Sequence, residues 1–347
     1  MKKYISNYPF RIQKKSSLFN IASNFEINFF IKNKSVNNPV FLSGLARSGT
    51  TIITDILNNT QKFSSFLYQD MPFYKTPILW NYVKKFFSQK EIKKIRREHG
   101  DNIYYNFQSP DAFEELIWSN YIEDYENNFA NVLSSDYSNE NLINDLKNSI
   151  SKIIYLRGQN RYLSKGNYNL FRINFLAKEF QNAKFIILIR DPFQTAFSLE
   201  KIDKRFSTFG HEDKKFDEIL NNLCHFEFGN NKKIPNFFKN KEIIKNCWIN
   251  DELFLGYLLF WKETYEFVYN TYLTTDVKKK IHLINYNEFK KNYKKEIKKL
   301  FSFLDIEYNE NQNFNINFTE DHQINHEISG ELKSNIYSLY NNIIKVS

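Results

Sequence analysis

The chain has 347 residues, of which 42% are hydrophobic, and a formal net charge of +9. This length and apolar content are enough to bury a sizeable core, as one large α/β domain or as one domain with an elaborated cap. The basic excess suits an anionic cofactor, whereas the two cysteines, Cys224 and Cys247, exclude a disulfide framework and lack metal-ligand spacing.

The N-terminal segment is basic but lacks an apolar core of signal-peptide length. The longest apolar stretches, such as 254–261, are far too short to span a bilayer. We therefore expect a cytoplasmic protein without a transmembrane segment. Residues 1–37 would form an N-terminal extension, and residues 38–347 a single domain.

Residues 39–51 read Pro-Val-Phe-Leu-Ser-Gly-Leu-Ala-Arg-Ser-Gly-Thr-Thr. The apolar run Val40 to Leu42 predicts a buried strand, and Gly44 and Gly49 bound a loop. Apolar residues at helical spacing follow, which predicts a helix over about 50–58. A strand, a glycine-bounded loop and a helix N-terminus present backbone N–H groups to an anion. The segment therefore predicts a phosphate-binding site.

The glycine spacing matches the nucleotide-binding P-loop, with Thr50 in place of the phosphate-bridging lysine. The nearest cation, Arg47, lies inside the loop. A kinase or ATPase without that lysine loses a point charge on the transferring phosphate. The loop is thus better suited to holding a 5′-phosphate than to transferring a terminal phosphoryl group. Thr50 or Thr51 as an ordinary helix cap is the alternative.

A short strand is predicted at Arg161 to Leu163, with Lys165 two residues further on, at the end of the strand, and a helix over 170–181. The run Lys184 to Ile189 is almost continuously apolar, as expected for a central parallel strand. Arg190 would lie at its carboxyl end, where open α/β sheets bind ligands.

Pro192 can open the next helix, over 193–203, and Ser198 would lie about two turns into it. An arginine at a strand end and a serine on the following helix can bind one phosphate together, the guanidinium as a fork and the hydroxyl as a single donor. A surface pair of Arg190 with Asp191 is the alternative for an isolated motif.

Further elements are a long helix at 251–271, a strand at Ile281 to Ile284 and an amphipathic basic helix over about 289–304. Strands that alternate with helices predict a three-layer α/β fold of the P-loop NTPase type, with a central parallel sheet and helices on both faces. The polar stretches 71–150 and 204–250 would be insertions over the strand ends, where they form an acceptor-binding cap.

The segment Ala46-Arg47-Ser48-Gly49-Thr50-Thr51 resembles the loop Pro-Arg-Ser-Gly-Thr-Thr of the sulfotransferases that use 3′-phosphoadenosine 5′-phosphosulfate (PAPS). The interval from Arg190 to Ser198 matches the pair that binds the 3′-phosphate in that family. The resemblance spans about residues 38–305. It implies a P-loop sulfotransferase that binds PAPS without a metal, through residues Arg47, Ser48, Gly49, Thr50, Thr51, Arg190 and Ser198.

The resemblance also implies catalytic roles. Lys165 and Arg47 would stabilise negative charge as the sulfuryl group is transferred. Asp70, about twenty residues past the loop, is the first candidate for the base that takes the acceptor's proton. The alternatives are His99, Glu114 and Glu115.

The acceptor would be a carbohydrate, a lipid or a small molecule with a hydroxyl or amine, and the sequence carries no code for its identity or for the oligomeric state. Two other functions stay open. A P-loop nucleotide kinase would need a lysine and Mg²⁺, and a non-catalytic basic module would bind nucleotide or polyanion without Asp70 or Lys165. Nucleic acid is not expected as a partner, because the lysines near the C-terminal part lie on the solvated face of a packed helix.

Overall fold

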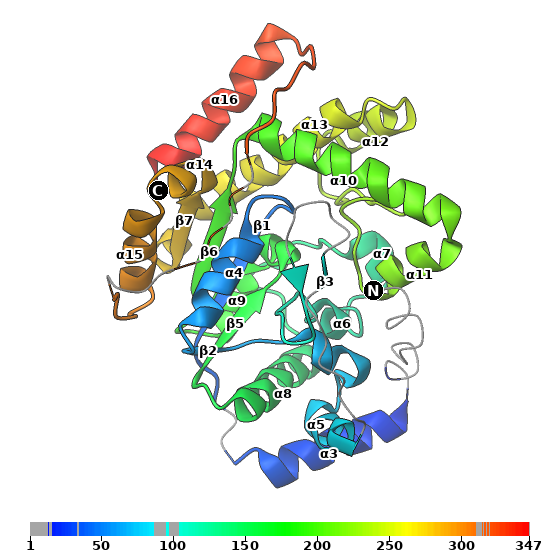
Figure 1. The fold of residues 1–347 in the computed structure, drawn as a ribbon, viewed down its shortest axis with the longest axis vertical. Coiled ribbons are helices and arrows are strands. Elements are labelled where there is room, and N and C mark those ends of the chain that lie inside the picture. The colour runs from blue at the N-terminus through cyan, green and yellow to red at the C-terminus, as the bar shows by residue number, and fades with distance from the viewer. Residues whose placement is uncertain are drawn as a thin grey trace.

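A computed structural model describes residues 13, 16–32, 35–86, 95–96, 104–309, 314, 316, 318 and 320–346. A twisted parallel sheet forms the centre of this part of the chain (Figure 1). Its spatial order is β2-β5-β1-β6-β7, and each neighbouring pair is parallel. The strands are β1 (Asn37–Gly44), β2 (Phe63–Ser64), β5 (Arg161–Lys165), β6 (Lys184–Ile189) and β7 (Ile281–Asn285).

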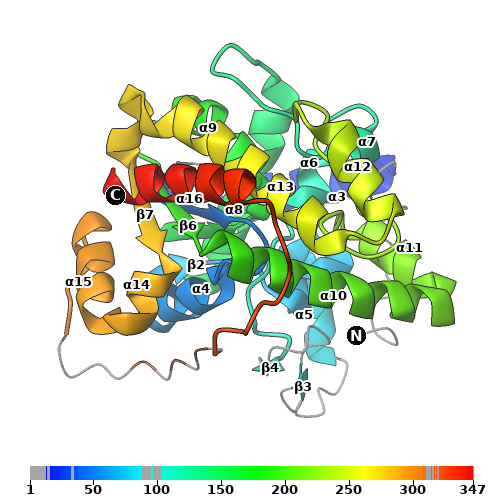
Figure 2. The same ribbon diagram turned by 90° about the horizontal axis from the view of Figure 1, so that it is seen from above.

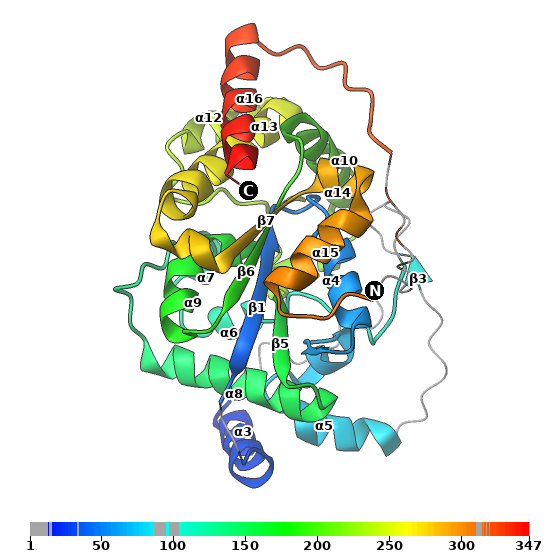
Figure 3. The same cartoon turned by 90° about the vertical axis from the view of Figure 1, so that its left-hand side faces the viewer.

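The sheet has helices on both faces, which Figure 3 shows with the strands between the two layers. Alternate residues of the strands point to opposite faces. Val40 and Leu42 belong to the smaller core, together with apolar residues of α4 (Thr50–Asn59), α14 (Tyr286–Lys291) and α15 (Tyr293–Phe303). Phe41 belongs to the larger core on the other face, which includes α8 (Glu140–Arg157), α9 (Ile173–Glu179), α10 (Pro192–Glu212) and α13 (Leu253–Val268).

The order of the strands brings three sequence segments to one edge of the sheet. β1 is central, with β5 on one side and β6 on the other. Leu42 is in register with Lys165 of β5, and Gly44 with Leu188 of β6. The segments that follow these three strands therefore emerge side by side at the carboxyl edge. This is where open α/β sheets bind ligands, at the point where the strand order reverses.

The other elements extend from this frame (Figures 1 and 2). In the described part of the chain, the 3₁₀ segments η1 and η2, the β3–β4 hairpin and four helices lie between β2 and β5. Four more helices, a π segment and a 3₁₀ segment lie between β6 and β7. These elements and the remaining ones are α3 (Ser17–Phe30), η1 (Tyr68–Phe73), α5 (Pro77–Val83), η2 (Lys84–Phe86), β3 (Ile95–Arg96), β4 (Tyr104–Tyr105), α6 (Glu115–Trp118), α7 (Tyr125–Asn128), η3 (Asn167–Phe171), α11 (Lys214–Asn222), α12 (Lys241–Ile249), η4 (Tyr269–Leu273), η5 (Asp276–Lys280) and α16 (Gly330–Lys345).

The predicted α/β fold is confirmed, and all four predicted strands are present. The helix predicted over 289–304 is divided at Asn292 into α14 and α15, and the helix predicted from residue 193 continues to Glu212. The pattern missed β2, because two residues at the sheet edge are too short to show alternation. The division of the chain into an extension, a domain and a cap stays a prediction.

Cys224 and Cys247 are both buried and are not joined in a disulfide bond. Among the described residues, none of the helices combines the length and the apolarity that a membrane span requires.

Candidate functional site

The loop between β1 and α4 has a backbone that only a small set of residues can adopt. Gly49 has φ +101°, in the left-handed region that favours glycine. A Cβ at this position would lie 2.5 Å from the Tyr286 ring, so a side chain there would collide with α14. Gly49 is followed at once by the first residue of α4, and the first amides of a helix lack intrahelical partners. The loop therefore aims a positive helix end at the carboxyl edge of the sheet.

Two distant motifs meet at this loop. The guanidinium of Arg190, directly after β6, donates from Nη1 to the carbonyl oxygen of Arg47 at 3.2 Å. The Nε of Arg47 in turn donates to Oγ of Ser198 on α10 at 2.9 Å. The structure thus brings together residues of the loop, the strand end and the following helix, as the sequence predicted. Their binding of a nucleotide stays a prediction.

Arg190 is a buried cation whose charge is only partly compensated. Its guanidinium lies over the Tyr286 ring at 5.1 Å, and the residue is 5% exposed. Nη2 makes no hydrogen bond with the described residues and lies 3.8 Å from Asp321 Oδ1. Burial lowers the pKa of Arg190 by more than Tyr286 and Asp321 raise it. Such a site favours an additional anion.

Tyr265 on α13, which belongs to the larger core, connects the loop to the end of β6. Its hydroxyl donates to the carbonyl oxygen of Leu188 at 2.6 Å and accepts from the Leu45 amide at 3.5 Å. Burial raises the pKa of Tyr265, so the hydroxyl keeps its proton. The sequence analysis missed this residue, because a tyrosine within an apolar helix carries no sign of a polar contact.

Lys165 ends β5 beside the loop between β1 and α4, and the next amide, of Gly166, donates to Leu42 of β1 at 3.0 Å. Its Nζ lies 3.0 Å from Asp111 Oδ1, and the hydroxyl of Tyr68 donates to the other oxygen of Asp111. Lys165 therefore lies at the end of a strand, at the carboxyl edge of the sheet, as predicted. Its role in catalysis stays a prediction. The sequence did not identify Asp111 as its partner.

Asp70 lies in a different set of contacts. Its Oδ2 accepts from the Leu67 amide at 2.9 Å, at the start of η1, and forms an ion pair with Arg157 at the end of α8. The residue is buried. These contacts give the carboxylate a structural role at the beginning of a helix, and nothing in them points to the acceptor site. The role of Asp70 as general base stays a prediction.

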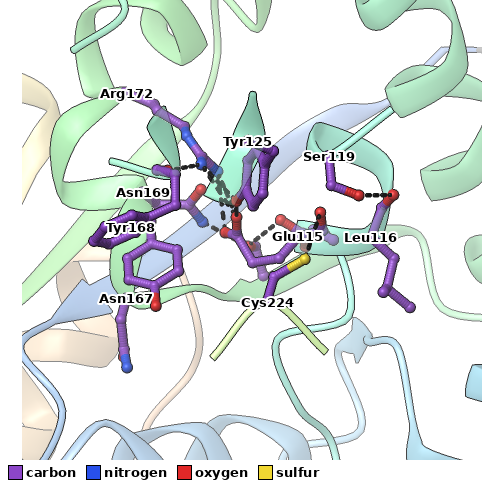
Figure 4. Close-up of polar contacts among 12 residues, drawn as sticks. Glu115, Leu116, Ser119, Tyr125, Asn167, Tyr168, Asn169, Arg172 and Cys224 are labelled. Atoms are coloured by element: carbon purple, nitrogen blue, oxygen red, sulfur yellow. Dashed lines mark hydrogen bonds and ion pairs between the residues drawn. The ribbon is translucent and has the colours of Figure 1, made fainter. Parts of the chain in front are cut away.

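The alternative bases are also accounted for, except His99, which lies outside the described residues. Glu114 is buried and accepts from the hydroxyls of Tyr162 and Ser164, and burial raises its pKa to about 7. Glu115 pairs with the buried Arg172 at 3.0 Å and also accepts from Tyr125 (Figure 4). Both carboxylates lie inside the larger core, which indicates a structural role.

The described residues contain no group of three or more histidine, cysteine, aspartate or glutamate side chains that suits a metal ion.

The chain was compared with known protein families. A family model described as the sulfotransferase family matches residues 39–227, which is more than half of the chain. The chain therefore belongs to the sulfotransferase family. The match begins in β1, contains the loop, Lys165, Arg190 and Ser198, and ends at Glu227. No curated protein matches.

A solved sulfotransferase structure shows the same fold. Sulfotransferase STF1 from Mycobacterium tuberculosis superposes with a TM-score of 0.51 at 11% sequence identity, over 84% of this chain and 74% of that chain. Sulfotransferase STF9 from Mycobacterium avium gives 0.47 at 11% identity, over 92% of this chain and 72% of that one. A sulfotransferase from Alicyclobacillus acidocaldarius gives 0.41 at 11% identity, over 90% and 94%. At this identity the likeness to STF1 concerns the fold alone.

Proposed function

We propose that this sulfotransferase uses PAPS as its donor and transfers the sulfuryl group to a hydroxyl or amine of a carbohydrate, a lipid or a small molecule. The observation that carries the proposal is the contact between the Arg190 guanidinium and the Arg47 carbonyl. It joins a loop suited to a 5′-phosphate with a partly compensated buried cation suited to a second phosphate. PAPS carries phosphate groups at both ends of its ribose.

The 5′ side of the nucleotide would be held by Arg47, Ser48 and the first residues of α4, Thr50 and Thr51, with Gly49 allowing the close approach of the backbone. The 3′-phosphate would be held by Arg190 and Ser198. A phosphate at Arg190 would satisfy the Nη2 group, which makes no hydrogen bond with the described residues. Charge-assisted hydrogen bonds of this kind are among the strongest in proteins.

PAPS supplies an activated sulfuryl group whose departure leaves negative charge on the bridging oxygen. Lys165 and Arg47 would stabilise that charge, because Arg47 lies within the loop and Lys165 lies at the carboxyl edge beside it. We also propose a single domain over 38–347, with the insertions 71–150 and 204–250 forming the acceptor cap, and a cytoplasmic location. The chemistry needs no metal ion.

The test is transfer of ³⁵S-labelled sulfate from PAPS to a panel of carbohydrate, lipid, phenol and peptide acceptors. We expect label in at least one acceptor class, and slower transfer by Lys165→Ala at unchanged PAPS affinity. Hydrolysis or transfer of ATP phosphate without any use of PAPS would establish a kinase instead. Binding of PAPS without transfer to any acceptor would favour a non-catalytic nucleotide-binding module.

A further inference from the structure

Helix α3 carries apolar residues on the outside of the molecule. Figures 1 and 3 show the helix at one end of the fold, with α8 between it and the sheet. Leu18, Ile21, Phe25 and Phe29 recur at helical spacing along its outer face, and we call them the α3 stripe. Their exposed fractions run from 49% for Phe25 to 73% for Leu18. An apolar stripe on a helix normally faces the core, so the outward position needs an explanation.

The inner side of α3 is polar, and it fixes the helix in this orientation. Glu26 is fully buried and forms an ion pair with Nζ of Lys152 on α8 at 3.2 Å, while its Oε1 accepts from the Leu79 amide at 2.7 Å. The Lys152 ammonium also donates to Oγ of Ser23 at 2.6 Å and to the Lys75 carbonyl at 2.7 Å. Turning the helix round would leave a buried charge without its partner, which is strongly destabilising. The α3 stripe is therefore held toward the outside.

Aromatic side chains extend the exposed apolar surface from α3 to two other helices. The rings of Phe25 and Phe29 stack at 5.3 Å. Phe30 lies 6.0 Å from the ring of Tyr82 on α5 and 5.7 Å from that of Tyr155 on α8. Both tyrosines are exposed. Contiguous apolar surface of this kind marks an interaction site, and tyrosine is typical of interfaces where an apolar and an aqueous phase meet.

The charge around this surface is positive. Lys32, two residues past the end of α3, and Lys85 of η2 are exposed, and Nζ of Lys85 lies 5.4 Å from the centre of the Tyr82 ring. Of the residues in α3, α5 and η2, all of which the structure describes, only Glu26 is a carboxylate, and it is buried. Residues 1–15, which precede the helix in the chain, include five lysines or arginines and no aspartate or glutamate. The surface thus complements an anionic partner.

A second copy of the chain suits this face less well than a lipid surface does. In a two-fold dimer the same face of both copies meets, so the basic residues around one stripe would approach those around the other. Anionic headgroups meet the same lysines with the opposite charge. In addition, α3 ends seven residues before β1 begins and lies on the amino side of that strand (Figure 3). A membrane at α3 therefore leaves the carboxyl edge of the sheet open.

We propose that the α3 stripe, together with Lys32 and Lys85, docks on a membrane surface that carries anionic headgroups. The leucine, isoleucine and phenylalanine side chains enter the boundary between headgroups and acyl chains, and the two ammonium groups pair with headgroup phosphates. The protein is then bound peripherally, with α3 lying in the plane of the surface. This inference goes beyond the proposed function and does not depend on the donor or the acceptor.

The experiment measures co-sedimentation of the full chain with vesicles of phosphatidylcholine alone or of phosphatidylcholine and phosphatidylglycerol in equal parts. The wild type should bind the mixed vesicles about tenfold or more tightly than phosphatidylcholine alone, because each lysine near an anionic surface contributes roughly a factor of five. The double variant Phe25→Ser, Phe29→Ser should weaken binding to the mixed vesicles by about tenfold or more, since it removes two inserted aromatic rings.

A second double variant, Lys32→Glu with Lys85→Glu, tests the charge. It should weaken binding to the mixed vesicles by about tenfold or more and leave binding to phosphatidylcholine nearly unchanged. Raising the salt concentration should have the same effect as this variant.

Matched controls replace the same residue types on other faces. Ile243→Ser with Ile249→Ser removes two exposed apolar side chains from α12, and Lys278→Glu with Lys279→Glu reverses two exposed charges on η5. Both should bind the vesicles as the wild type does. All four double variants change exposed residues, so circular dichroism should show an unchanged thermal midpoint.

Other results overturn the proposal. Absence of wild-type binding to the mixed vesicles, or equal losses in the α3 variant and the α12 control, shows that the stripe does not dock on lipid. Equal binding to both vesicle types rejects the anionic headgroup as the partner. A wild-type dimer in sedimentation equilibrium that becomes monomeric in Phe25→Ser, Phe29→Ser identifies a second copy as the occupant instead.

Discussion

Arg172 and Arg190 are both buried arginines, but their surroundings compensate the two charges to different extents. Arg172 donates to Glu115 through both terminal nitrogens and also donates to the Phe129 carbonyl. Burial alone would lower its pKa, but Glu115 raises it above the ordinary value. Arg190 donates to the Arg47 carbonyl and has Asp321 as its nearest carboxylate among the described residues, at 3.8 Å, and its pKa is lowered. Of the two arginines, Arg190 is thus the one whose charge is only partly compensated.

At this scale we predict that Glu115→Gln destabilises the fold. The substitution leaves the buried Arg172 without a counterion, and breaking a buried ion pair costs about 3–5 kcal/mol. Urea unfolding should show a lower midpoint with an unchanged slope. Glu126→Gln is the control, because its ion pair with Lys233 is on the surface and should contribute less than about 1 kcal/mol. Equal stability of the two variants would contradict the structural role of Glu115.

Single residues were predictable from the sequence where a motif fixed them. Arg47, Arg190 and Ser198 followed from their spacing, and the structure brings them into contact. The partners of Asp70 and Glu115 were not predictable, because an ion pair with Arg157 or Arg172 depends on how distant helices pack.

At the scale of elements, the segment from residue 320 to α16 crosses the candidate nucleotide site. Figure 2 shows it running along α10 before α16. Asp321 lies 3.8 Å from Arg190 and 3.3 Å from Lys290. The side-chain amide of Gln194 donates to the carbonyl oxygen of His322 and accepts from its backbone N–H, each at 2.9 Å. A carboxylate of this segment thus occupies the position beside Arg190 that a 3′-phosphate would need.

We predict that Asp321→Asn strengthens the binding of 3′-phosphoadenosine 5′-phosphate (PAP). The neutral side chain removes both the competing ion pair with Arg190 and the repulsion of a phosphate. Since Asp321 is half exposed, the gain should be about twofold to fivefold, as for ion pairs worth up to about 1 kcal/mol. Calorimetric titration with PAP measures it, and Asp276→Asn, an exposed carboxylate on η5, serves as the control. Weaker binding by Asp321→Asn would show that the carboxylate supports the site.

The position of this segment was not predictable from the sequence. The sheet strands were predictable because continuous apolar runs end in polar or glycine residues, as in β1 and β6. Helix α16 and its lead-in segment carry no binding motif, and their position depends on packing of Ile336, Tyr340 and Ile343 against the larger core. Such long-range packing is not encoded in local periodicity.

At the scale of the whole molecule, the sheet order explains how one site is assembled from distant segments. β1 and β6 are neighbours although about 140 residues separate them, and Gly44 lies opposite Leu188. The glycine loop and Arg190 therefore share the carboxyl edge by topology. The sequence predicted a parallel sheet and the residues at the ends of its strands. The order of the strands in the sheet is known only from the structure. We propose that one nucleotide, with two phosphate groups, binds both the glycine loop and Arg190.

The most direct test compares the binding of PAP and adenosine 5′-monophosphate, which lacks the 3′-phosphate, to the wild type and to Arg190→Ala. Loss of one charge-assisted phosphate contact should weaken PAP binding by about 1.5–3 kcal/mol and leave the monophosphate nearly unaffected. Arg205→Ala, an exposed arginine on α10, should change neither affinity. If Arg190→Ala weakens both nucleotides equally, or neither, the guanidinium does not hold the 3′-phosphate and the account is contradicted.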